Sequence, residues 1–482
     1  MNNLLSQRRA GILLHITSLP SGDFGKDALR FVDFLHEAGA SVWQTLPLNM
    51  PHADGSPYQC LSAHAGNPQF ISISSLQDQG LLSDEDIAHL VDDKQGLINQ
   101  AFVNFEAQSN INLKEHFESF CQQHVNWLHD FSLFLVLRQQ FQSTGWNLWP
   151  DAYKHREALT MKYVEHEFAH QIAAIKFTQY VFFQQWHALK HYANSKNVYL
   201  FGDIPIFVAF DSADVWAKPE LFKLDAERNA TVIAGVPPDY FSAVGQRWGN
   251  PHYDWQAMEQ DGFKWWLERI STQHELFDMV RIDHFRGLQA AWEIPAEDET
   301  AINGQWVLAP GDALLQAIKQ HLPDIALVAE DLGIITDEVD ELRNKYELPG
   351  MKILHFAFDG GADNPYLPQN IEPNSVVYTG THDNDTTLGW YNALDDHQRY
   401  HLHAHLDNGT PSMPFALVET ALACNANLAI VPMQDLLELD STHRMNIPGT
   451  ALGNWQWRFD WHQIKSGMQQ RTAELIHKYG RN

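Results

Sequence analysis

Short apolar runs rich in β-branched residues recur along the chain, and each ends in polar, glycine or proline residues before a helical pattern begins. The runs are apolar on both faces, as the strands of a parallel sheet covered by helices must be. Helical patterns such as Trp265–His274, Ala313–His321 and Thr336–Tyr346 separate most of them. This alternation predicts an α/β fold, a (β/α)8 TIM barrel with inserted subdomains. The eight predicted strands are Gly11–Ile16, Ser41–Leu46, Val198–Asp203, Met279–Ile282, Ala326–Ala329, Lys352–Phe356, Val376–Thr379 and Leu428–Val431.

The regular spacing breaks between the second and third predicted strands. In this gap Leu81–Asn194 has a helical pattern throughout, and Met161–Lys190 is a near-continuous amphipathic stretch. Because the barrel pattern resumes afterwards, we expect residues 58–196 to form a large, mainly helical insertion subdomain on the barrel.

The remaining chain belongs to the barrel in this interpretation. Residues 1–57 hold its first two strands, and residues 197–482 hold the rest of the catalytic barrel. Within the second part, residues 209–254 are rich in proline, glycine and aromatic side chains. Such a composition favours an active-site loop subdomain over the top of the barrel.

The charge balance narrows the choice of partners. Of 482 residues, 32 are Lys or Arg and 60 are Asp or Glu, a formal net charge of −28. Such a surface repels phosphate backbones and anionic lipid, so we expect neither nucleic acid nor a membrane as partner. A neutral substrate fits this charge.

The three cysteines, Cys60, Cys121 and Cys424, have no metal-binding spacing. They are interpreted as reduced thiols of a cytoplasmic protein. The N-terminus has no apolar stretch typical of a signal peptide, and no run is long enough to cross a membrane. The oligomeric state stays open between a monomer and a homodimer.

Three predicted barrel strands end in acids, which is where barrel enzymes place catalytic groups. The fourth strand runs into Asp283 (MVRIDHFRG), the fifth into Glu330 (ALVAEDLG) and the seventh into Asp383 (VVYTGTHDND). Three carboxylates on one rim suit glycoside chemistry. One attacks the anomeric carbon, one carries the proton of the leaving oxygen, and one binds sugar hydroxyls as positive charge develops. Their mutual repulsion separates their pKa values and helps Glu330 stay protonated.

Each of these residues also has a purely structural interpretation. A single acid at a strand end is often a helix cap or part of an ion pair, as is expected for Asp331 and Asp385. Arg281 is two residues before Asp283 and therefore points to the same barrel face, where it either keeps that carboxylate ionised or forms an ordinary salt bridge. His284 and His382 adjoin two of the acids, and each either binds sugar hydroxyls or packs as a buried histidine.

Other patterns carry less chemistry. The alternating histidines His401, His403 and His405 lie in a polar, helical region without matching ligands, so no metal site is predicted. Glycine-rich phosphate loops are absent from the sequence. Ser56 and Ser62 lie in no nucleophile-elbow context.

Long segments of the chain resemble the 4-α-glucanotransferases of glycoside hydrolase family 77, also called amylomaltases or disproportionating enzymes. The segments follow one another in order over almost the whole chain outside the helical insertion. The resemblance implies a (β/α)8 barrel with inserted subdomains, no obligatory cofactor and a double displacement on maltooligosaccharides. The segments are GILLHITSLPS, WQTLPLNMP, GSPYQCLSAHAGNP, GDIPIFVAFDSADVW, GVPPDYFSAVGQRWGNPHYDW, RIDHFRG, VAEDLG, NPYLP, GTHDNDT and MNIPGTALGNWQWR.

Carried over by motif, the resemblance implies that Asp283 is the nucleophile, Glu330 the general acid/base and Asp383 the transition-state stabiliser. It also implies a set of sugar contacts around them. HITSLPSGDFG and LELDSTHRMN depart from the family's usual wording, and both bear on substrate length rather than on the reaction. The implied substrate contacts are Arg281, His382, Tyr58, Asp211, Gln246, Trp248, Asn454 and Trp455, to which His284 is added as a neighbour of the nucleophile.

The expected activity is therefore the transfer of an α-1,4-glucan segment to the 4-hydroxyl of an acceptor. Maltooligosaccharides and glucans derived from starch or glycogen would be donors, and glucose would be an acceptor. Two rivals remain open: a hydrolase of the α-amylase type with water as the acceptor, and a catalytically silent glucan-binding protein. The presence of all three carboxylates argues against the second rival.

Overall fold

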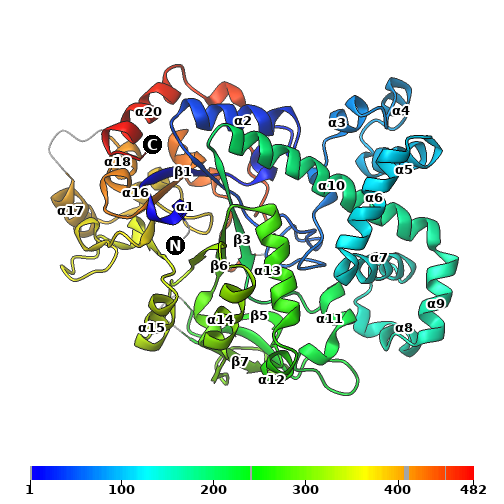
Figure 1. The fold of residues 1–482 in the computed structure, drawn as a ribbon. Helices are drawn as coiled ribbons and strands as arrows, with labels where there is room; N and C mark the ends of the chain where they lie inside the picture. The colour runs from blue at the N-terminus through cyan, green and yellow to red at the C-terminus, as the bar shows by residue number, and fades with distance from the viewer. Residues whose placement is uncertain (1–2, 239–241, 407–411, 451, 482) are drawn as a thin grey trace.

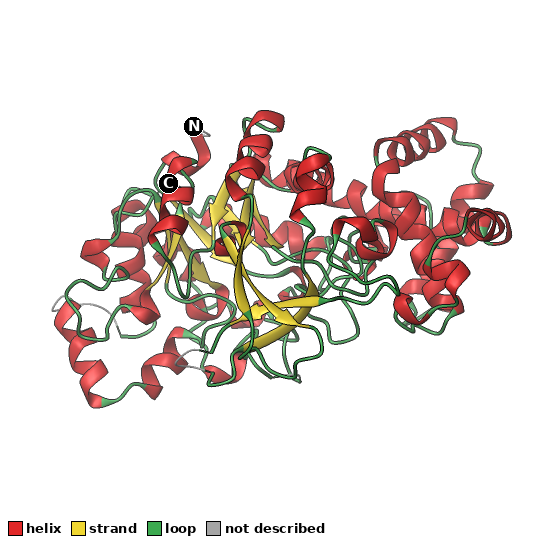
Figure 2. Cartoon of the chain, turned by 90° about the horizontal axis from the view of Figure 1, so that it is seen from below, coloured by secondary structure: helices red, strands yellow, loops and turns green. Residues whose placement is uncertain are grey.

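The computed structural model describes residues 3–238, 242–406, 412–450 and 452–481, and its centre is an eight-stranded parallel sheet. The strand order is β10-β11-β12-β1-β2-β3-β6-β9, and the Ala329 N–H donates to the Pro349 carbonyl at 2.9 Å where β9 approaches β10. Figure 2 shows the strands in the middle with helices around them. The strands are β1 (Arg9–Leu13), β2 (Val42–Gln44), β3 (Tyr199–Pro205), β6 (Met279–Asp283), β9 (Ala326–Ala329), β10 (Gly350–Ile353), β11 (Ser375–Tyr378) and β12 (Leu428–Pro432).

This sheet confirms the predicted (β/α)8 barrel, and each of the eight predicted strands overlaps an observed one. The sixth is displaced: the prediction covered Lys352–Phe356, whereas β10 ends at Ile353 and Leu354–Phe356 form a 3-10 turn. Both faces of the strands are buried. Side chains such as Phe201, Met279 and Tyr378 fill the barrel interior, and the opposite faces pack under the helices.

Helices cover the outside of the barrel, including α13, α14 and α15, which the sequence predicts. Asp337 and Glu338 lie in the first turn of α15, where negative charge is favourable. The helices outside the insertion are α1 (Asn3–Ser6), α2 (Lys26–Glu37), α11 (Ala213–Ala217), α12 (Trp255–Gln260), α13 (Lys264–Leu276), α14 (Gly311–His321), α15 (Asp337–Lys345), α16 (Thr387–Ala393), α17 (Asp396–His405), α18 (Phe415–Ala423), α19 (Met433–Leu436) and α20 (Met468–Lys478). None of the described helices is long and apolar enough to span a bilayer.

The segment between β2 and β3 contains eight helices, which Figure 1 shows gathered on one side of the barrel. The first begins at Ile73, so residues 58–72 precede the helical part that the sequence places at 58–196. The near-continuous helical stretch is interrupted at Phe168, between α9 and α10. The helices are α3 (Ile73–Asp78), α4 (Asp84–His89), α5 (Lys94–Ala107), α6 (Ile111–Gln123), α7 (Val125–Gln140), α8 (Asp151–Lys154), α9 (Ala158–Glu167) and α10 (Ala169–Ser195).

A second sheet, separate from the barrel, is antiparallel and has the strand order β5-β4-β7-β8. Its strands are β4 (Val232–Val236), β5 (Gln246–Pro251), β7 (Ala290–Pro295) and β8 (Gln305–Leu308). The segment 209–254, expected to be a loop subdomain, thus contributes two strands and shares its sheet with residues that follow β6. The strand β5 reads QRWGNP and is exposed at its start, so no apolar alternation marks it as a strand.

The helix α10 joins the insertion to the barrel through Trp186, whose side chain is fully buried. Its indole Nε1–H donates to the Leu276 carbonyl at 2.7 Å, and its ring lies 5.1 Å from Phe24 and 5.4 Å from Phe277. Because these partners belong to the barrel, Trp186 helps to hold the long helix of the insertion against it, together with hydrogen bonds from Lys190 and Tyr192.

Replacing Trp186 by alanine should lower the free energy of unfolding by about 3–5 kcal/mol, the usual cost of deleting a buried aromatic ring. Denaturant unfolding measures this loss. Leu159→Ala, at an 83% exposed position of the same insertion, is the control and should leave the stability nearly unchanged. Equal stability of the Trp186 variant and the wild type would show that α10 is held by other contacts.

Candidate active site

A cavity of about 1140 Å³ opens at the carboxyl ends of the barrel strands, between the barrel and the second sheet. Side chains from β5, from the turns after β6, β9 and β11, and from the loop before Trp455 line it. Most of the residues predicted as a site meet here. The cavity lining includes Asp283, Glu330, Asp383, Arg281, Tyr58, Gln246, Trp248, His284 and Trp455.

Arg281 is the buried centre of this site. Its Nη1 donates to both carboxylate oxygens of Asp203 at 2.8 and 2.7 Å, and its Nη2 donates to Asp283 Oδ1 at 2.7 Å. Asp203 is the residue of β3 that pairs with Arg281 in the sheet, so the barrel register itself brings the two together. Burial opposes the charge of the guanidinium, but Asp203 and Asp283 outweigh it and raise the pKa of Arg281 well above its usual value.

Glu330 is held by backbone rather than by a cation. The His284 N–H donates to Glu330 Oε2 at 2.6 Å, and the Leu332 N–H donates to Oε1 at 3.1 Å. His284 adopts a left-handed conformation, with φ 54° and ψ 49°, directly after the end of β6. This costly geometry turns its N–H towards Glu330 and thereby ties the end of β6 to the end of β9.

The carboxyls of Asp203, Asp283 and Glu330 lie around one guanidinium, which bonds to the first two of them. Burial raises the pKa of Asp283, against the opposing effect of Arg281, and the charge of Glu330 raises it further. Burial likewise raises the pKa of Glu330, while Arg281 and the two backbone N–H groups oppose the rise. Since two interacting carboxyls titrate as a pair, the raised pKa values of Asp283 and Glu330 belong to the pair rather than to either residue alone.

The third acid lies across the cavity. Asn446 Nδ2 donates to Asp383 Oδ1 at 2.6 Å, and His382 Nε2 lies 3.4 Å from the same oxygen. Tyr58 completes the link, because its hydroxyl donates to Asp203 at 2.7 Å and lies 2.9 Å from His382 Nε2. Burial lowers the pKa of His382, so this imidazole is neutral at physiological pH.

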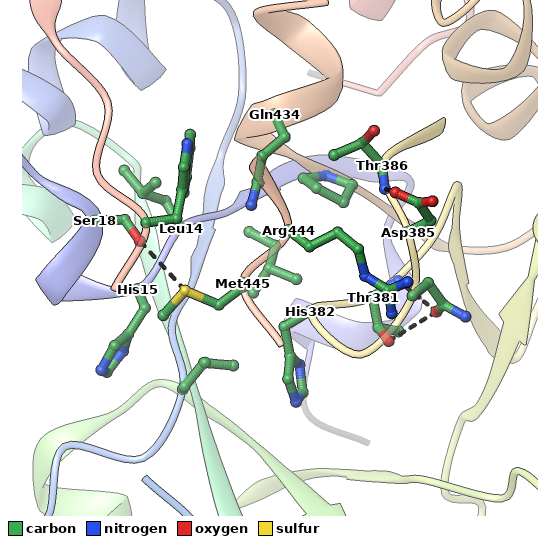
Figure 3. Close-up of a pocket in the computed structure, with 15 residues that line it drawn as sticks. Leu14, His15, Ser18, Thr381, His382, Asp385, Thr386, Gln434, Arg444 and Met445 are labelled. Carbon is green, nitrogen blue, oxygen red and sulfur yellow. Dashed lines mark hydrogen bonds between the residues drawn. The ribbon is translucent and has the colours of Figure 1, made fainter. Parts of the chain in front are cut away.

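His382 itself lines a smaller pocket (Figure 3) rather than the large cavity. Ser18 Oγ donates to Met445 Sδ at 3.7 Å there, as Figure 3 shows. Burial and the neighbouring His382 lower the pKa of His15 to about 3. Neutral imidazoles thus line both pockets and leave the negative charge of the carboxyls uncompensated by histidine.

Trp248 and His284 form one wall. The Trp248 ring meets the His284 ring edge-on at 4.9 Å, and its Nε1–H donates to Gln246 Oε1 at 3.2 Å. Burial lowers the pKa of His284 to about 3. Its Nε2 is buried and, within the described part of the chain, has no hydrogen-bond partner, so it is available to a bound hydroxyl group.

Three predicted contacts lie outside the lining of the large cavity: His382, which lines the smaller pocket, Asp211 and Asn454. Asp211 forms an ion pair with Arg138 of α7 and accepts from the Trp146 N–H at 3.3 Å, away from the cavity lining. Asn454 is occupied by its own loop: its Oδ1 accepts from the Ile447 N–H at 3.0 Å, and its Nδ2 donates to the Thr450 carbonyl at 2.9 Å.

Several residues in or beside the cavity were not among the predicted ones. Asp203 ends a predicted strand, the same signal that identified the other acids, and could have been found. Asn446 has no local signal, since its partner Asp383 is 63 positions away. Asp331 and Asp385 have the structural roles expected of them: Asp331 accepts from the Met351 N–H at 2.7 Å, and Asp385 accepts from Ser441 Oγ at 2.7 Å. The cavity also has an aromatic part formed by Phe356, Phe358, Tyr366 and Trp390.

The alternating histidines lie on α17, where His401 Nε2 approaches His397 Nε2 at 3.1 Å. Across the described residues, no group of three or more His, Cys, Asp or Glu side chains is arranged to hold a metal ion.

A parallel eight-stranded barrel with carboxyls gathered at the carboxyl ends of its strands is the arrangement of a glycoside-processing barrel enzyme. The chain belongs to the 4-alpha-glucanotransferase family, glycoside hydrolase family 77, whose family model matches residues 14–464. Its activity is 4-alpha-glucanotransferase activity on α-glucans, and the mechanism of this family retains the anomeric configuration.

Relatives similar over nearly the whole chain support this assignment. The 4-alpha-glucanotransferase of Thermus thermophilus is 45% identical over 94% of both chains, and that of Synechocystis is 43% identical over 99% of both. Among solved structures, the amylomaltase from Streptococcus agalactiae in complex with acarbose superposes with a TM-score of 0.94 at 35% identity, covering 99% of this chain and 100% of that one.

The upward shifts of both carboxyl pKa values predict the pH dependence of kcat/KM. Activity should fall at low pH as the ionised carboxyl gains a proton, and at high pH as the pair loses its shared proton. Both limbs should lie above the pH of about 4 at which ordinary carboxyls titrate. Rates on maltotriose between acid and alkaline pH measure this profile.

Arg281→Lys should move the acid limb to still higher pH, because one ammonium group cannot reach both Asp203 and Asp283 as the guanidinium does. A wild-type acid limb near the ordinary carboxyl value, unmoved in this variant, would contradict the assigned cause.

Proposed function

We propose that Asp283 is the nucleophile and Glu330 the general acid/base of the glucan transfer. The observation that carries this proposal is their placement on paired strands. Ile282 of β6 pairs with Ala329 of β9, so the two carboxyls follow at the same level. Neighbouring strands are about 4.8 Å apart, close to the separation of roughly 5–5.5 Å between the carboxyls of retaining enzymes.

The reaction proceeds in two displacements. Glu330 donates its proton to the glycosidic oxygen while Asp283 attacks the anomeric carbon, so the bond to the leaving glucan breaks and a β-glycosyl ester forms. Glu330, now ionised, takes the proton of an incoming 4-hydroxyl as that oxygen displaces Asp283. Two inversions restore the α configuration, and one α-1,4 bond replaces another.

The neighbouring groups have distinct tasks in this scheme. Arg281 favours the ionised form of Asp283 through its 2.7 Å hydrogen bond. The two backbone N–H groups hold the Glu330 carboxyl towards the glycosidic oxygen. Asp383 exchanges its hydrogen bond with Asn446 for sugar hydroxyls and stabilises the positive charge of the transition state. His382, which is held by Tyr58, orients the Asp383 carboxyl.

Transfer prevails over hydrolysis when an acceptor sugar excludes water from the ester. Trp248, Gln246 and His284 form the wall proposed for this task, and Trp455 with Tyr58 forms another. Tyr240, which the sequence places in the same aromatic segment, lies outside the described residues.

The proposed donors are maltooligosaccharides and α-1,4-glucans from starch or glycogen, with glucose as an acceptor. The acarbose complex of the streptococcal amylomaltase supports this choice, as does the volume of the cavity. A cytoplasmic location belongs to the same proposal and is supported by Cys60, Cys121 and Cys424, which are all free thiols.

The Glu330→Gln variant tests the acid. It cannot protonate a natural leaving group, so turnover of maltotriose should fall by about 10²–10⁴-fold, the usual contribution of general acid catalysis. Fluoride needs no proton to leave, so single-turnover release of fluoride from an α-maltosyl fluoride should stay near the wild-type rate.

Asp283→Asn is the matched contrast, since it lacks the nucleophile and should lose both reactions. Equal losses with the two donors in the Glu330 variant would contradict the role of Glu330 as the acid. Near-normal turnover of the Asp283 variant would contradict the role of Asp283 as the nucleophile.

Maltotriose as the only substrate tests the reaction as a whole. Each cycle breaks one α-1,4 bond and makes another, so glucose and a ladder of longer maltooligosaccharides should appear while the total of reducing ends stays nearly constant. Chromatography of the products and a reducing-end assay measure both quantities. Added glucose should shift the products to shorter chains, whereas reducing ends that rise in step with bond cleavage would indicate a hydrolase.

A further inference from the structure

Arg286 lies three residues after the proposed nucleophile and outside the cavity lining, and its side chain is buried. It belongs to the 3-10 turn Phe285–Leu288, which begins directly after the left-handed His284. Nothing in the mechanism above uses it. A guanidinium buried beside the site, on the turn that holds Glu330, needs a physical reason.

Its contacts reach the loop that follows β9. The Arg286 Nη1–H donates to the Ile334 carbonyl, and the guanidinium carbon lies 3.7 Å from the ring centroid of Trp306 on β8. Burial lowers the pKa of Arg286, and the negative charge of Glu338 opposes this change. The side chain therefore bridges three elements: the turn after β6, the second sheet and the loop between β9 and α15.

Residues 332–335, in the loop between β9 and α15, have few hydrogen bonds to the rest of the protein. In the described chain, no backbone-to-backbone hydrogen bond involves residues 332–335. Leu332 and Gly333 line the cavity, and the side chain of Ile334 is 51% exposed. Among the described contacts of residues 332–335, two are polar: the Leu332 N–H bound to Glu330 Oε1, and the Ile334 carbonyl bound to Arg286. The residues before them, Glu330 and Asp331, are held by backbone and side-chain contacts of their own.

These attachments act on the same carboxyl. Glu330 Oε2 accepts from the His284 N–H, at the start of the turn that carries Arg286, and Oε1 accepts from the Leu332 N–H, in the loop that Arg286 holds. We propose that Arg286 is a positioning residue for the acid/base: by joining the turn after β6 to the loop after β9, it fixes both backbone N–H groups that orient the Glu330 carboxyl.

This inference rests on the proposed role of Glu330, and it identifies a function for Trp306 as well. The indole face fixes the plane of the guanidinium, so that Nη1 points at the Ile334 carbonyl. Trp306 is itself held edge-on by Trp292 at 5.2 Å. The contact between Trp306 and Arg286 thus connects β8 of the second sheet to the residues that hold Glu330, although β8 lies outside the cavity lining.

The test compares two donors in the Arg286→Met variant. Turnover of maltotriose should fall by about ten- to a hundredfold, the effect of a misplaced catalytic group, while KM changes little. Single-turnover release of fluoride from α-maltosyl fluoride, which needs no proton donor, should stay within about threefold of the wild type. Equal losses with both donors, or a rise in KM alone, would overturn the proposal.

A double-mutant cycle separates this inference from the proposed function. In the Glu330→Gln background, Arg286→Met should cost no further activity on maltotriose, because the group that it positions can no longer donate a proton. If Glu330→Gln alone retains activity, the role of Glu330 fails. If it loses activity but Arg286→Met adds its full effect, the role of Arg286 fails.

Two further variants guard against a general effect on folding. Trp306→Leu alters only a partly exposed ring and should show the same donor dependence to a smaller degree, so it carries the test if Arg286→Met does not fold. Arg156→Met removes a similar contact, in which the guanidinium of an insertion residue lies 4.5 Å from the ring centroid of Trp216 on α11, and should leave both donors unaffected. A uniform loss with both donors in Trp306→Leu would also contradict the proposal.

Discussion

The active-site end of the barrel depends on the charge of Arg281. A guanidinium buried in a barrel is stable only with carboxylates around it, and the pairing of β3 with β6 supplies Asp203 directly beside it. Its Nη2 donates to Asp283, and the hydroxyl of Tyr58, in the loop after β2, donates to Asp203. The strand register therefore places Asp203 beside Arg281, and the charge of Arg281 in turn affects the protonation of Asp283. A change in any of these three side chains alters the electrostatics of the other two.

The barrel strands were predictable because each is buried on both faces, so apolar runs of strand length alternate with helical patterns. The second sheet was not predictable by the same means. Its strand β5 contains glycine, proline and polar residues, and it pairs through β4 with residues that follow β6. The sixth strand was predicted too far along the chain because Leu354–Phe356 are largely apolar although they form a 3-10 turn. Hydrophobicity alone does not distinguish such a turn from the end of a strand.

The site was predictable to the extent that chemistry follows strand ends. Asp283 and Glu330 meet because β6 and β9 are neighbours, and Arg281 joins them because side chains alternate along a strand. Motif resemblance alone does not say which side chain of a conserved-looking segment faces the cavity. Asp211 turns to Arg138, and Asn454 stabilises its own loop. Contacts such as Asn446 with Asp383 depend on tertiary structure and leave no local trace.

The two neighbouring acids Glu330 and Asp331 follow β9 at the place where this strand approaches β10. The described sheet ends at these two strands, where the Ala329 N–H reaches the Pro349 carbonyl, and the Asp331 side chain accepts the Met351 N–H in place of a ladder carbonyl. Successive side chains point in opposite directions, so Glu330, the proposed acid/base, lines the cavity while Asp331 bonds to the neighbouring strand. One backbone hydrogen bond and one side chain thus close the barrel at the level of Glu330, so the position of the proposed acid/base depends on the contact between β9 and β10.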